Sequence, residues 1–492
     1  MSGPVGEEER KGLLSEETSY QEPKPEVQNS NWSIKKILLI LSTFILGFLL
    51  FFGSILECWT RFADGKQQIT LTNSNDILVS NGTHEFKPTV LMVSIDGLRA
   101  DYLDRGLTPH LLEISRVGLR AEWMRPIFPT LTFPNHWALL TGLYAESHGI
   151  VANNFWDPET NSTFLYSDPK QSWDASWWDG EPIWETAGKA GLITANLMWP
   201  GPPITQTGAS PTYYVPFKNK VPLNEKLDQL LQWVDKPLED RPQLILAYEP
   251  SLDQAGHAYG PGSKEVNNSL VYIDTFARDL HQALADRNLS EIIDIVFVSD
   301  HGMTDTRHVE FIYLEKLIGQ DLVDAIEHVD GWPSMGLRFH NKTDMSKALE
   351  FLTAAATNMP DKLSVYTTET MLERYHFNHN PRIAPLYIVP NIGYAVTTEK
   401  EGPSRMTKGN HGYDNFQPSM FAAFISDGPF STTIKYNKRE TTDAAGWHST
   451  GEYHIINGFQ NVELYGLICK LLGIESFAAD TNGTKGFWDK YF

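Results

Sequence analysis

Apolar runs that lead to an acidic residue are the clearest repeated pattern in this chain. The first, Thr89–Ile95, reads Thr-Val-Leu-Met-Val-Ser-Ile and ends at Asp96. Two more, at 243–249 and 292–299, have the same form and also lead to an aspartate. Strands that are apolar on both faces are typical of buried parallel sheets. Each run therefore predicts a strand with a carboxylate beyond its carboxyl end, where open α/β sheets bind ligands.

Between these runs the pattern changes to helical spacing. It is clearest over 264–285, where apolar residues recur at steps of three and four. Alternating strands and helices predict an α/β fold, with a largely parallel central sheet and helices on both faces. The hydrophobic content of 41% is enough for a large core. We therefore assign residues 88–492 to one α/β domain.

A long apolar stretch precedes this domain. From Ile37 to Leu56 the chain has twenty uncharged residues, enough at 1.5 Å per residue to cross a bilayer core of about 30 Å. No small-residue cleavage site follows, so we predict one uncleaved transmembrane signal-anchor helix over 35–57. The acidic segment 1–34 predicts a disordered cytoplasmic tail, and 58–87 reads as a polar connector.

Glycosylation triplets favour one orientation of this anchor. Six Asn-x-Ser/Thr triplets follow the apolar stretch, at Asn81, Asn161, Asn267, Asn288, Asn341 and Asn482. Another, at Asn31, lies on the opposite side. We therefore expect a single-pass type II membrane glycoprotein of the secretory pathway or cell surface, in the Golgi, plasma membrane or vacuole, with the large domain lumenal or extracellular.

Charge and cysteine content exclude some classes of protein. With 40 basic and 61 acidic residues the formal net charge is −21, which argues against binding a nucleic-acid backbone through a basic face. The two cysteines, Cys58 and Cys469, provide neither a disulfide framework nor a cysteine-based zinc site. Cys58, at the predicted membrane edge, is open to palmitoylation, to pairing between chains, or to no role.

Six side chains with nitrogen or oxygen donors follow the predicted strands or lie between glycines: Asp96, Asp253, His257, Asp300, His301 and His411. Each alone is more typical of a turn or a helix cap. Together they provide two sets of three ligands, a chemistry that suits zinc with an open position on each ion.

Thr132 lies two residues before Pro134, at a predicted helix start. By itself Thr-x-Pro is more typical of a plain helix cap. A helix start also attracts phosphate, and a nearby metal would activate the hydroxyl as a nucleophile.

Motifs around these residues occur in a characteristic order: Val-Ser-Ile-Asp96-Gly, Pro-Thr-Leu-Thr132-Phe-Pro-Asn-His, Gly180-Glu-Pro-Ile-Trp184, Trp199-Pro-Gly201, Asp253-x3-His257, Ser-Asp300-His301-Gly-Met and His411-Gly-Tyr-Asp-Asn415. From about Pro88 to Gly473 the chain resembles the ecto-nucleotide pyrophosphatase/phosphodiesterase family of the alkaline phosphatase superfamily. The resemblance implies an alkaline-phosphatase-like α/β fold. Two cysteines leave no room for the cysteine-rich or nuclease-like modules of animal members, so we expect the catalytic domain alone.

The resemblance also implies roles for single residues. One Zn²⁺ would be held by Asp253, His257 and His411, and the other by Asp96, Asp300, His301 and the hydroxyl of Thr132. Thr132 would be the nucleophile and carry a covalent nucleotidyl intermediate.

Three residues around Thr132 resemble the family's substrate contacts. Asn153, with the backbone N–H of Phe133, would hold a phosphate oxygen. Phe133 and a tyrosine of Pro211–Pro216, assigned here to Tyr214, would sandwich the base. Trp177 and Trp178 are interpreted as core aromatics.

The expected activity is hydrolysis of nucleotide pyrophosphate or phosphodiester bonds, for example ATP to AMP and pyrophosphate. Two alternatives remain open: a lysophospholipid or choline-type phosphodiesterase on the same fold, and a membrane scaffold whose catalysis has decayed.

Overall fold

Strands that are far apart in the sequence form one central sheet. The computed structural model describes residues 77–440, 447–450 and 453–492. Within them the largest sheet has nine strands, in the order β21 (Trp447–Thr450), β22 (Tyr453–Ile456), β4 (Leu119–Ala121), β20 (Phe424–Asp427), β11 (Ile293–Val298), β3 (Thr89–Ile95), β10 (Leu244–Glu249), β8 (Thr194–Leu197) and β9 (Tyr213–Val215). The five strands from β11 to β9 are parallel, whereas β20 runs antiparallel to both of its neighbours. The predicted largely parallel sheet is confirmed.

The predicted strands and the predicted helix agree closely with the structure. Strand β3 has the bounds expected, and β10 and β11 are shorter than the apolar runs by one residue and two residues. The predicted helix is α9, Lys264–Ala285, whose first turn is capped by the Ser263 hydroxyl accepting from the Val266 N–H. Apolar periodicity located these elements because each is buried along its length or along one stripe.

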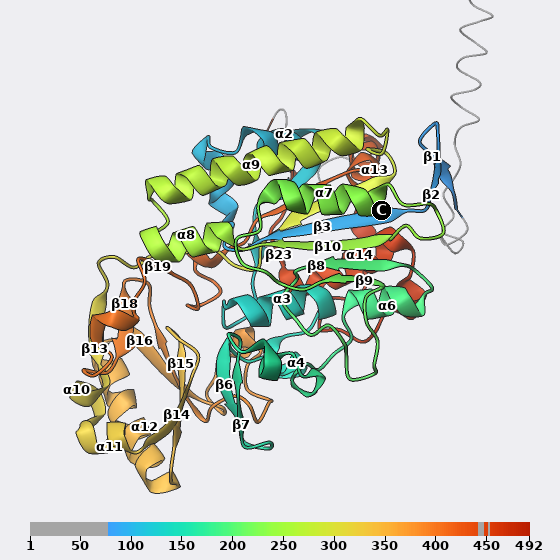
Figure 1. Ribbon diagram of the computed structural model, residues 1–492. Coiled ribbons are helices and arrows are strands. Elements are labelled where there is room, and N and C mark those ends of the chain that lie inside the picture. Colours follow the sequence, from blue (N-terminus) through green and yellow to red (C-terminus); the bar gives the residue numbers. More distant parts are fainter. Residues whose placement is uncertain (1–76, 441–446, 451–452) are drawn as a thin grey trace, which may run out of the picture. The chain divides into compact units, whose positions relative to one another are not determined.

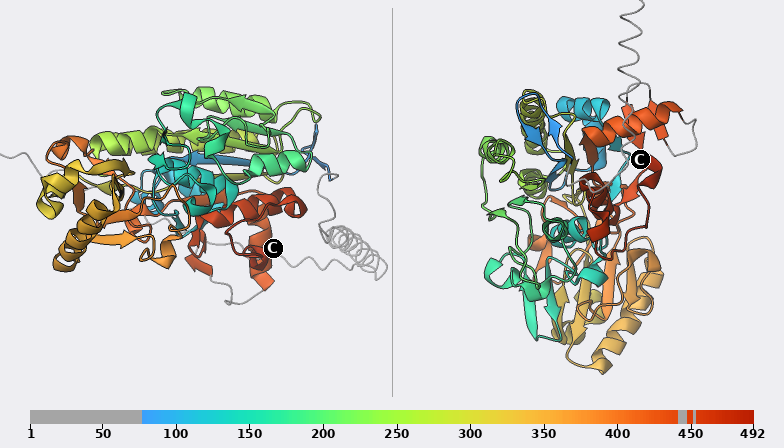
Figure 2. Two further views of the ribbon diagram at one scale, coloured as in Figure 1. Left: turned by 90° about the horizontal axis from the view of Figure 1, so that it is seen from below. Right: turned by 90° about the vertical axis from the view of Figure 1, so that its right-hand side faces the viewer.

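Side chains of β3 alternate between two hydrophobic cores. Val90 and Met92 face one core, and Leu91 and Val93 face the other. The second core is covered by α2 (Pro109–Val117), α7 (Leu223–Val234) and α9. The first is covered by α3 (Thr132–Thr141), α6 (Ile183–Lys189) and α14 (Leu464–Leu472). The figures show these helices on opposite faces of the sheet (Figures 1 and 2).

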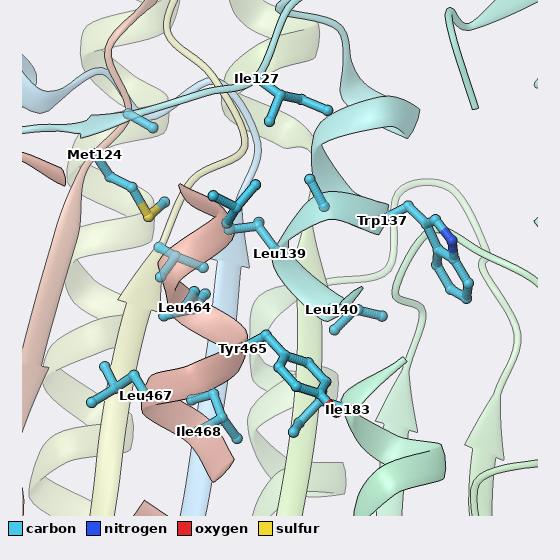
Figure 3. Close-up of a cluster of buried hydrophobic side chains, with 14 of the residues drawn as sticks. Met124, Ile127, Trp137, Leu139, Leu140, Ile183, Leu464, Tyr465, Leu467 and Ile468 are labelled. Carbon is cyan, nitrogen blue, oxygen red and sulfur yellow. The ribbon is translucent and has the colours of Figure 1, made fainter. Parts of the chain in front are cut away.

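Helices α3 and α14 pack together through apolar side chains. Figure 3 shows Leu139 of α3 beside Leu464 of α14 and Leu140 beside Tyr465, and all four are at most 1% exposed. Such burial contributes about 1.5–3 kcal/mol for each large apolar side chain. This packing fixes the helix whose first residue is Thr132.

A smaller lobe lies between the third apolar strand and His411 in the sequence. Its antiparallel sheet has the order β14 (Ile326–Asp330), β15 (Met335–Phe339), β17 (Leu386–Pro390) and β16 (Leu363–Thr367). It packs on α10 (Leu314–Ile318), α11 (Gln320–Asp324) and α12 (Lys342–Asn358) around its own core. This lobe was not predicted from the sequence.

The remaining strands form pairs: β1 (Val79–Ser80) with β2 (Glu85–Phe86), β5 (Met124–Arg125) with β23 (Phe459–Gln460), β6 (Asn154–Asp157) with β7 (Ser162–Leu165), β12 (Thr304–Asp305) with β19 (Gly409–Asn410), and β13 (Glu310–Tyr313) with β18 (Tyr394–Thr397). The remaining α-helices are α4 (Ala145–His148), α5 (Pro169–Ser172), α8 (Ser251–Tyr259) and α13 (Pro429–Glu440).

The predicted tail 1–34, the predicted anchor 35–57 and most of the connector lie outside the described residues. Among the helices of the described part, none has the length and apolar character to cross a membrane. The anchor therefore stays a prediction.

Candidate active site

The six predicted metal ligands converge at the carboxyl ends of the central strands. Asp96 follows β3, Asp300 and His301 follow β11, and Asp253 with His257 project from α8, after β10. His411 comes directly after β19, at the end of the chain segment that forms the smaller lobe. All except His257 are nearly buried.

One group joins Asp253, His257 and His411. Asp253 Oδ1 lies 3.5 Å from Nε2 of each histidine, and the two Nε2 atoms are 3.1 Å apart. These distances are short enough for a single cation to be shared by the three atoms. The predicted set of three is therefore close together.

The second group joins Asp96, Asp300 and His301. His301 Nε2 lies 3.0 Å from Asp300 Oδ2 and 3.5 Å from Asp96 Oδ1. The two groups touch, because the rings of His301 and His411 stack at 3.6 Å. Asp253, His301 and His411 also satisfy the geometry of a three-ligand group, so the division between the sets rests on the family resemblance.

The histidine rings are oriented as metal ligands require. Nδ1 of His257 contacts the Gly409 carbonyl at 2.9 Å, Nδ1 of His411 contacts the Thr130 carbonyl at 2.8 Å, and Nδ1 of His301 contacts the Gly302 carbonyl at 2.9 Å. A carbonyl only accepts, so each Nδ1 carries the hydrogen and donates. Nε2 is then the atom directed at the group, as in histidine metal sites.

The carboxylates of the two groups also have the properties of metal ligands. Asp96 Oδ1, Asp253 Oδ1 and Asp300 Oδ2 are buried and make no hydrogen bond. Burial, with repulsion from Asp300 and Asp253, raises the pKa of Asp96 well above its usual range. Burial likewise lowers the pKa of His411 well below its usual range, with repulsion from the neighbouring histidines adding to it. Buried carboxylate oxygens without hydrogen-bond partners fit a site for cations, whose charge would neutralise that of the carboxylates.

Two glycines allow the backbone segments to approach this closely. Gly97 has φ of 72°, and a Cβ there would lie 3.1 Å from the Asp253 Cα. A Cβ at Gly409 would lie 2.5 Å from the Gly256 carbonyl oxygen. A side chain at either position would push the ligands apart.

Thr132 is the first residue of α3, and its hydroxyl is not a helix cap. The N-cap is Leu131, with no side-chain cap bond, so the plain-cap interpretation is wrong. Pro134 is accordingly the third helical residue and not the first, where its missing N–H still costs nothing. Thr132 Oγ1 instead lies 3.1 Å from His301 Nε2, at the second ligand group.

Asn153 lies beside this helix start. Its side-chain oxygen accepts a hydrogen bond from the Phe133 N–H at 3.0 Å. The two groups predicted to hold one phosphate oxygen are therefore neighbours in the structure.

A cavity of about 610 Å³ opens over these residues. Its aromatic lining residues are Phe133, Tyr166, Trp173, Phe217 and Tyr248. Tyr214 does not line it, which corrects its predicted place in the base sandwich: it lies on the edge strand β9, and the chain reaches the cavity only three residues later, at Phe217.

Tyr248 and His136 are contacts that the sequence analysis missed. The Tyr248 hydroxyl donates to Asp96 Oδ2 at 2.5 Å. His136 lies one turn after Thr132 and contacts the Thr132 carbonyl at 2.9 Å, the Ser94 hydroxyl at 2.9 Å and Asp300 Oδ2 at 3.3 Å. A usable signal existed for Tyr248, because a buried tyrosine at a strand end needs a partner for its hydroxyl.

The two tryptophans interpreted as core residues are confirmed. Trp177 is 7% and Trp178 is 2% exposed, and both pack in the core below the sheet. Trp178 also lies 6.2 Å from the Phe133 ring, so it supports the cavity wall from behind.

Sequence comparisons agree on one group of enzymes. A family model described as type I phosphodiesterase / nucleotide pyrophosphatase matches residues 90–414. An uncharacterized pyrophosphatase/phosphodiesterase of Schizosaccharomyces pombe is 38% identical over 412 residues, covering 82% of this chain and 80% of the relative. Human ectonucleotide pyrophosphatase/phosphodiesterase family member 1 is 33% identical over 408 residues, covering 81% of this chain and 41% of the relative. The chain spans less than half of that animal relative.

Solved structures show the same fold. Murine ectonucleotide pyrophosphatase/phosphodiesterase 5 aligns with a TM-score of 0.70 at 29% identity, covering 82% of this chain and 98% of that chain. An inactive threonine-to-alanine variant of the murine protein, in complex with AMP, aligns with a TM-score of 0.71 at 27% identity, covering 82% and 100%. These similarities confirm the predicted fold class.

Proposed function

The chain belongs to the type I phosphodiesterase / nucleotide pyrophosphatase family, and from that premise we propose that it hydrolyses nucleotide pyrophosphate or phosphodiester bonds, with two Zn²⁺ ions and Thr132 as the nucleophile. ATP would give AMP and pyrophosphate. The observation that carries the proposal is the placement of the Thr132 hydroxyl 3.1 Å from His301, at the edge of two touching ligand groups.

The six residues named above would hold the two zinc ions, because their nitrogen atoms and unpaired carboxylate oxygens lie close together. When bound, the ions would lower the pKa of the threonine hydroxyl and neutralise the phosphoryl charge. Thr132 Oγ1 would attack the α-phosphorus and form a covalent nucleotidyl ester as the bond to the leaving group, pyrophosphate for ATP, breaks. Water would then hydrolyse this ester, which releases the nucleoside monophosphate and restores the threonine hydroxyl. The inactive threonine-to-alanine variant of the murine relative supports a threonine in this role.

Asn153 and the Phe133 N–H orient the phosphoryl group. In the structure the Phe133 N–H donates to the Asn153 side-chain oxygen, so the two groups are neighbours, and a bound phosphoryl oxygen would replace this bond by accepting from the Phe133 N–H and the Asn153 amide group. Hydrogen-bond donors fixed in advance stabilise charge that develops in the transition state. Two further residues lie behind the ligands: the Tyr248 hydroxyl donates to Asp96 Oδ2, and His136 Nδ1 lies 3.3 Å from Asp300 Oδ2.

The activity is tested by supplying the zinc-loaded full chain with p-nitrophenyl thymidine monophosphate, ATP, a dinucleoside polyphosphate and lysophosphatidylcholine. We expect turnover of the nucleotides, with AMP and pyrophosphate from ATP. Turnover of lysophosphatidylcholine alone would assign the lipid alternative, and no turnover of any diester would assign the scaffold.

Phe217 is proposed to take the place that the sequence assigned to Tyr214. Phe217→Ala should raise the KM for nucleotide substrates roughly tenfold with little change in kcat, since base stacking on an aromatic ring contributes about 1–3 kcal/mol. Steady-state kinetics would measure this, with Tyr214→Ala as the matched control. Equal effects of the two substitutions, or a larger effect of Tyr214→Ala, would contradict the assignment.

We also propose that residues 35–57 anchor the chain, with the catalytic domain lumenal or extracellular. The six asparagines beyond the anchor support this, because all are at least partly exposed. Treatment with an N-glycosidase should increase the gel mobility of the chain from its native membranes. Unchanged mobility, together with protease sensitivity of the domain from the cytoplasmic side, would reverse the orientation.

A further inference from the structure

The catalytic cavity has an unusual charge distribution for an enzyme that acts on polyanions. Among the residues that the structure describes, no lysine or arginine lines it. Three lysines instead line a second cavity of about 300 Å³ next to it: Lys218, Lys220 and Lys226. In a chain with a formal net charge of −21, such a cluster of basic side chains is a marked local exception.

A single thin wall separates the two cavities. Along residues 217–220 the side chains alternate, because Phe217 and Asn219 line the catalytic cavity while Lys218 and Lys220 line the second one. Gln254 lines both cavities and donates to the Asn219 side-chain oxygen at 3.2 Å. A molecule in the second cavity would therefore contact the wall that carries Phe217.

The charges in the second cavity favour an anion. Lys226 is 3% exposed and donates to Glu249 Oε2 and to the Tyr248 carbonyl, each at 2.7 Å, so this lysine and this glutamate compensate each other. Glu249 also accepts from the Ser251 N–H at 2.9 Å. Lys218 and Lys220 form no ion pair with any residue in the described ranges. The cavity therefore keeps two positive charges, on exposed side chains, that no described carboxylate pairs with.

A polar group is also available inside it. The Ser251 hydroxyl is buried and has no hydrogen-bond partner among the described residues. A buried hydroxyl without a partner is costly and is ordinarily satisfied by a ligand or an ordered water. Lysine ammonium groups with a hydroxyl donor are a chemistry that binds phosphate.

We propose that this lysine pocket, formed by Lys218, Lys220, Lys226, Ser251 and Gln254, binds a phosphate-class anion. This pocket is separate from the metal centre. Any role of the pocket in catalysis rests on the proposed function. The anion has two possible sources, which share this chemistry: free orthophosphate or pyrophosphate, and a distal phosphate of a long nucleotide substrate.

Isothermal titration of the zinc-loaded full chain with orthophosphate tests the site. The wild type should bind one phosphate that the double variant Lys218→Gln/Lys220→Gln does not bind, or binds at least about tenfold more weakly. The reason is that the variant loses the charge-assisted hydrogen bonds of the two lysines. Lys342→Gln/Lys347→Gln, on the exposed side of α12, is the matched control and should behave as the wild type. Ser251→Ala should weaken the same phosphate severalfold.

The comparison distinguishes this proposal from the proposed function. If the metal centre binds no phosphate, the wild type should show one binding site and the double variant none. That result would support the lysine pocket even though the proposed function had failed. Identical titrations of the wild type and the double variant would overturn the pocket, whatever the enzyme hydrolyses.

Kinetics identify the source of the anion. If the pocket takes a distal phosphate, the double variant should raise the KM for a dinucleoside polyphosphate but leave the KM for p-nitrophenyl thymidine monophosphate unchanged. If it takes free phosphate, both KM values should be unchanged while the titration differs. An equal rise in both KM values would overturn the pocket as a separate site.

Discussion

Replacing Thr132 by alanine is expected to reduce hydrolysis of p-nitrophenyl thymidine monophosphate by a factor of about 10⁴ to 10⁶, because loss of the nucleophile in a covalent mechanism removes most of the rate enhancement. The substitution removes the hydroxyl and one methyl group at a nearly buried helix start that needs no side-chain cap. Fold and zinc content should therefore stay close to those of the wild type. Steady-state rates, circular dichroism and metal analysis measure the three quantities.

Thr132→Ser is the matched control, since it keeps the hydroxyl and loses only a methyl group. It should retain a measurable fraction of the activity and, with a radiolabelled nucleotide, trap the same covalent adduct. Normal turnover by Thr132→Ala would refute the nucleophile assignment. A loss of activity equal in both variants would point instead to packing at the start of α3.

Removing the metal ions is expected to abolish turnover and also to destabilise the fold. Without cations three buried carboxylate oxygens remain unpaired around His301 and His411. Ligands that bind only the native state stabilise it by about 3–4 kcal/mol per site at 100 to 1,000 times their Kd. Chelation should therefore lower the Tm, and added Zn²⁺ should restore both Tm and activity. Differential scanning fluorimetry and parallel rate measurements follow the two effects.

Two substitutions separate metal loss from general destabilisation. Asp300→Asn should lower the bound zinc below two ions per chain and remove the activity. Asp330→Asn weakens a buried ion pair in the smaller lobe, in which Arg338 lies 3.0 Å from the Asp330 carboxylate. This substitution should lower the Tm but leave zinc content and activity intact. A chelator that changes neither Tm nor rate would show that these six residues hold no catalytic metal.

Much of the fold was predictable because the central strands are buried on both faces. Continuous apolar runs located β3, β10 and β11, and the stripe of α9 located the longest helix of the described ranges. The smaller lobe was not predicted, because its short antiparallel strands, such as β14 and β16, are only partly buried and carry no long apolar run. Local pattern is weak evidence where packing against neighbours decides the strand.

The substrate side of the site was harder to predict than the ligand groups. Phe217 and Tyr214 lie three residues apart on one segment, and both are aromatic. Only the path of the chain after β9 decides which ring faces the cavity. Tyr248 and His136 were missed for a similar reason, since their partners Asp96 and Asp300 are distant in the sequence.

The sequence by itself determined the kinds of donor and where the strands deliver them, because periodicity and strand ends are local properties of the chain. It also pointed to the family through ordered motifs that surround Thr132. The tertiary structure alone decided which donors meet, because Thr132 and His301 are separated by 169 positions and come within 3.1 Å of each other only in the folded chain. It likewise decided that residues 217–220 form a wall with a phenylalanine on one side and lysines on the other, since that alternation has meaning only once a cavity lies on each side.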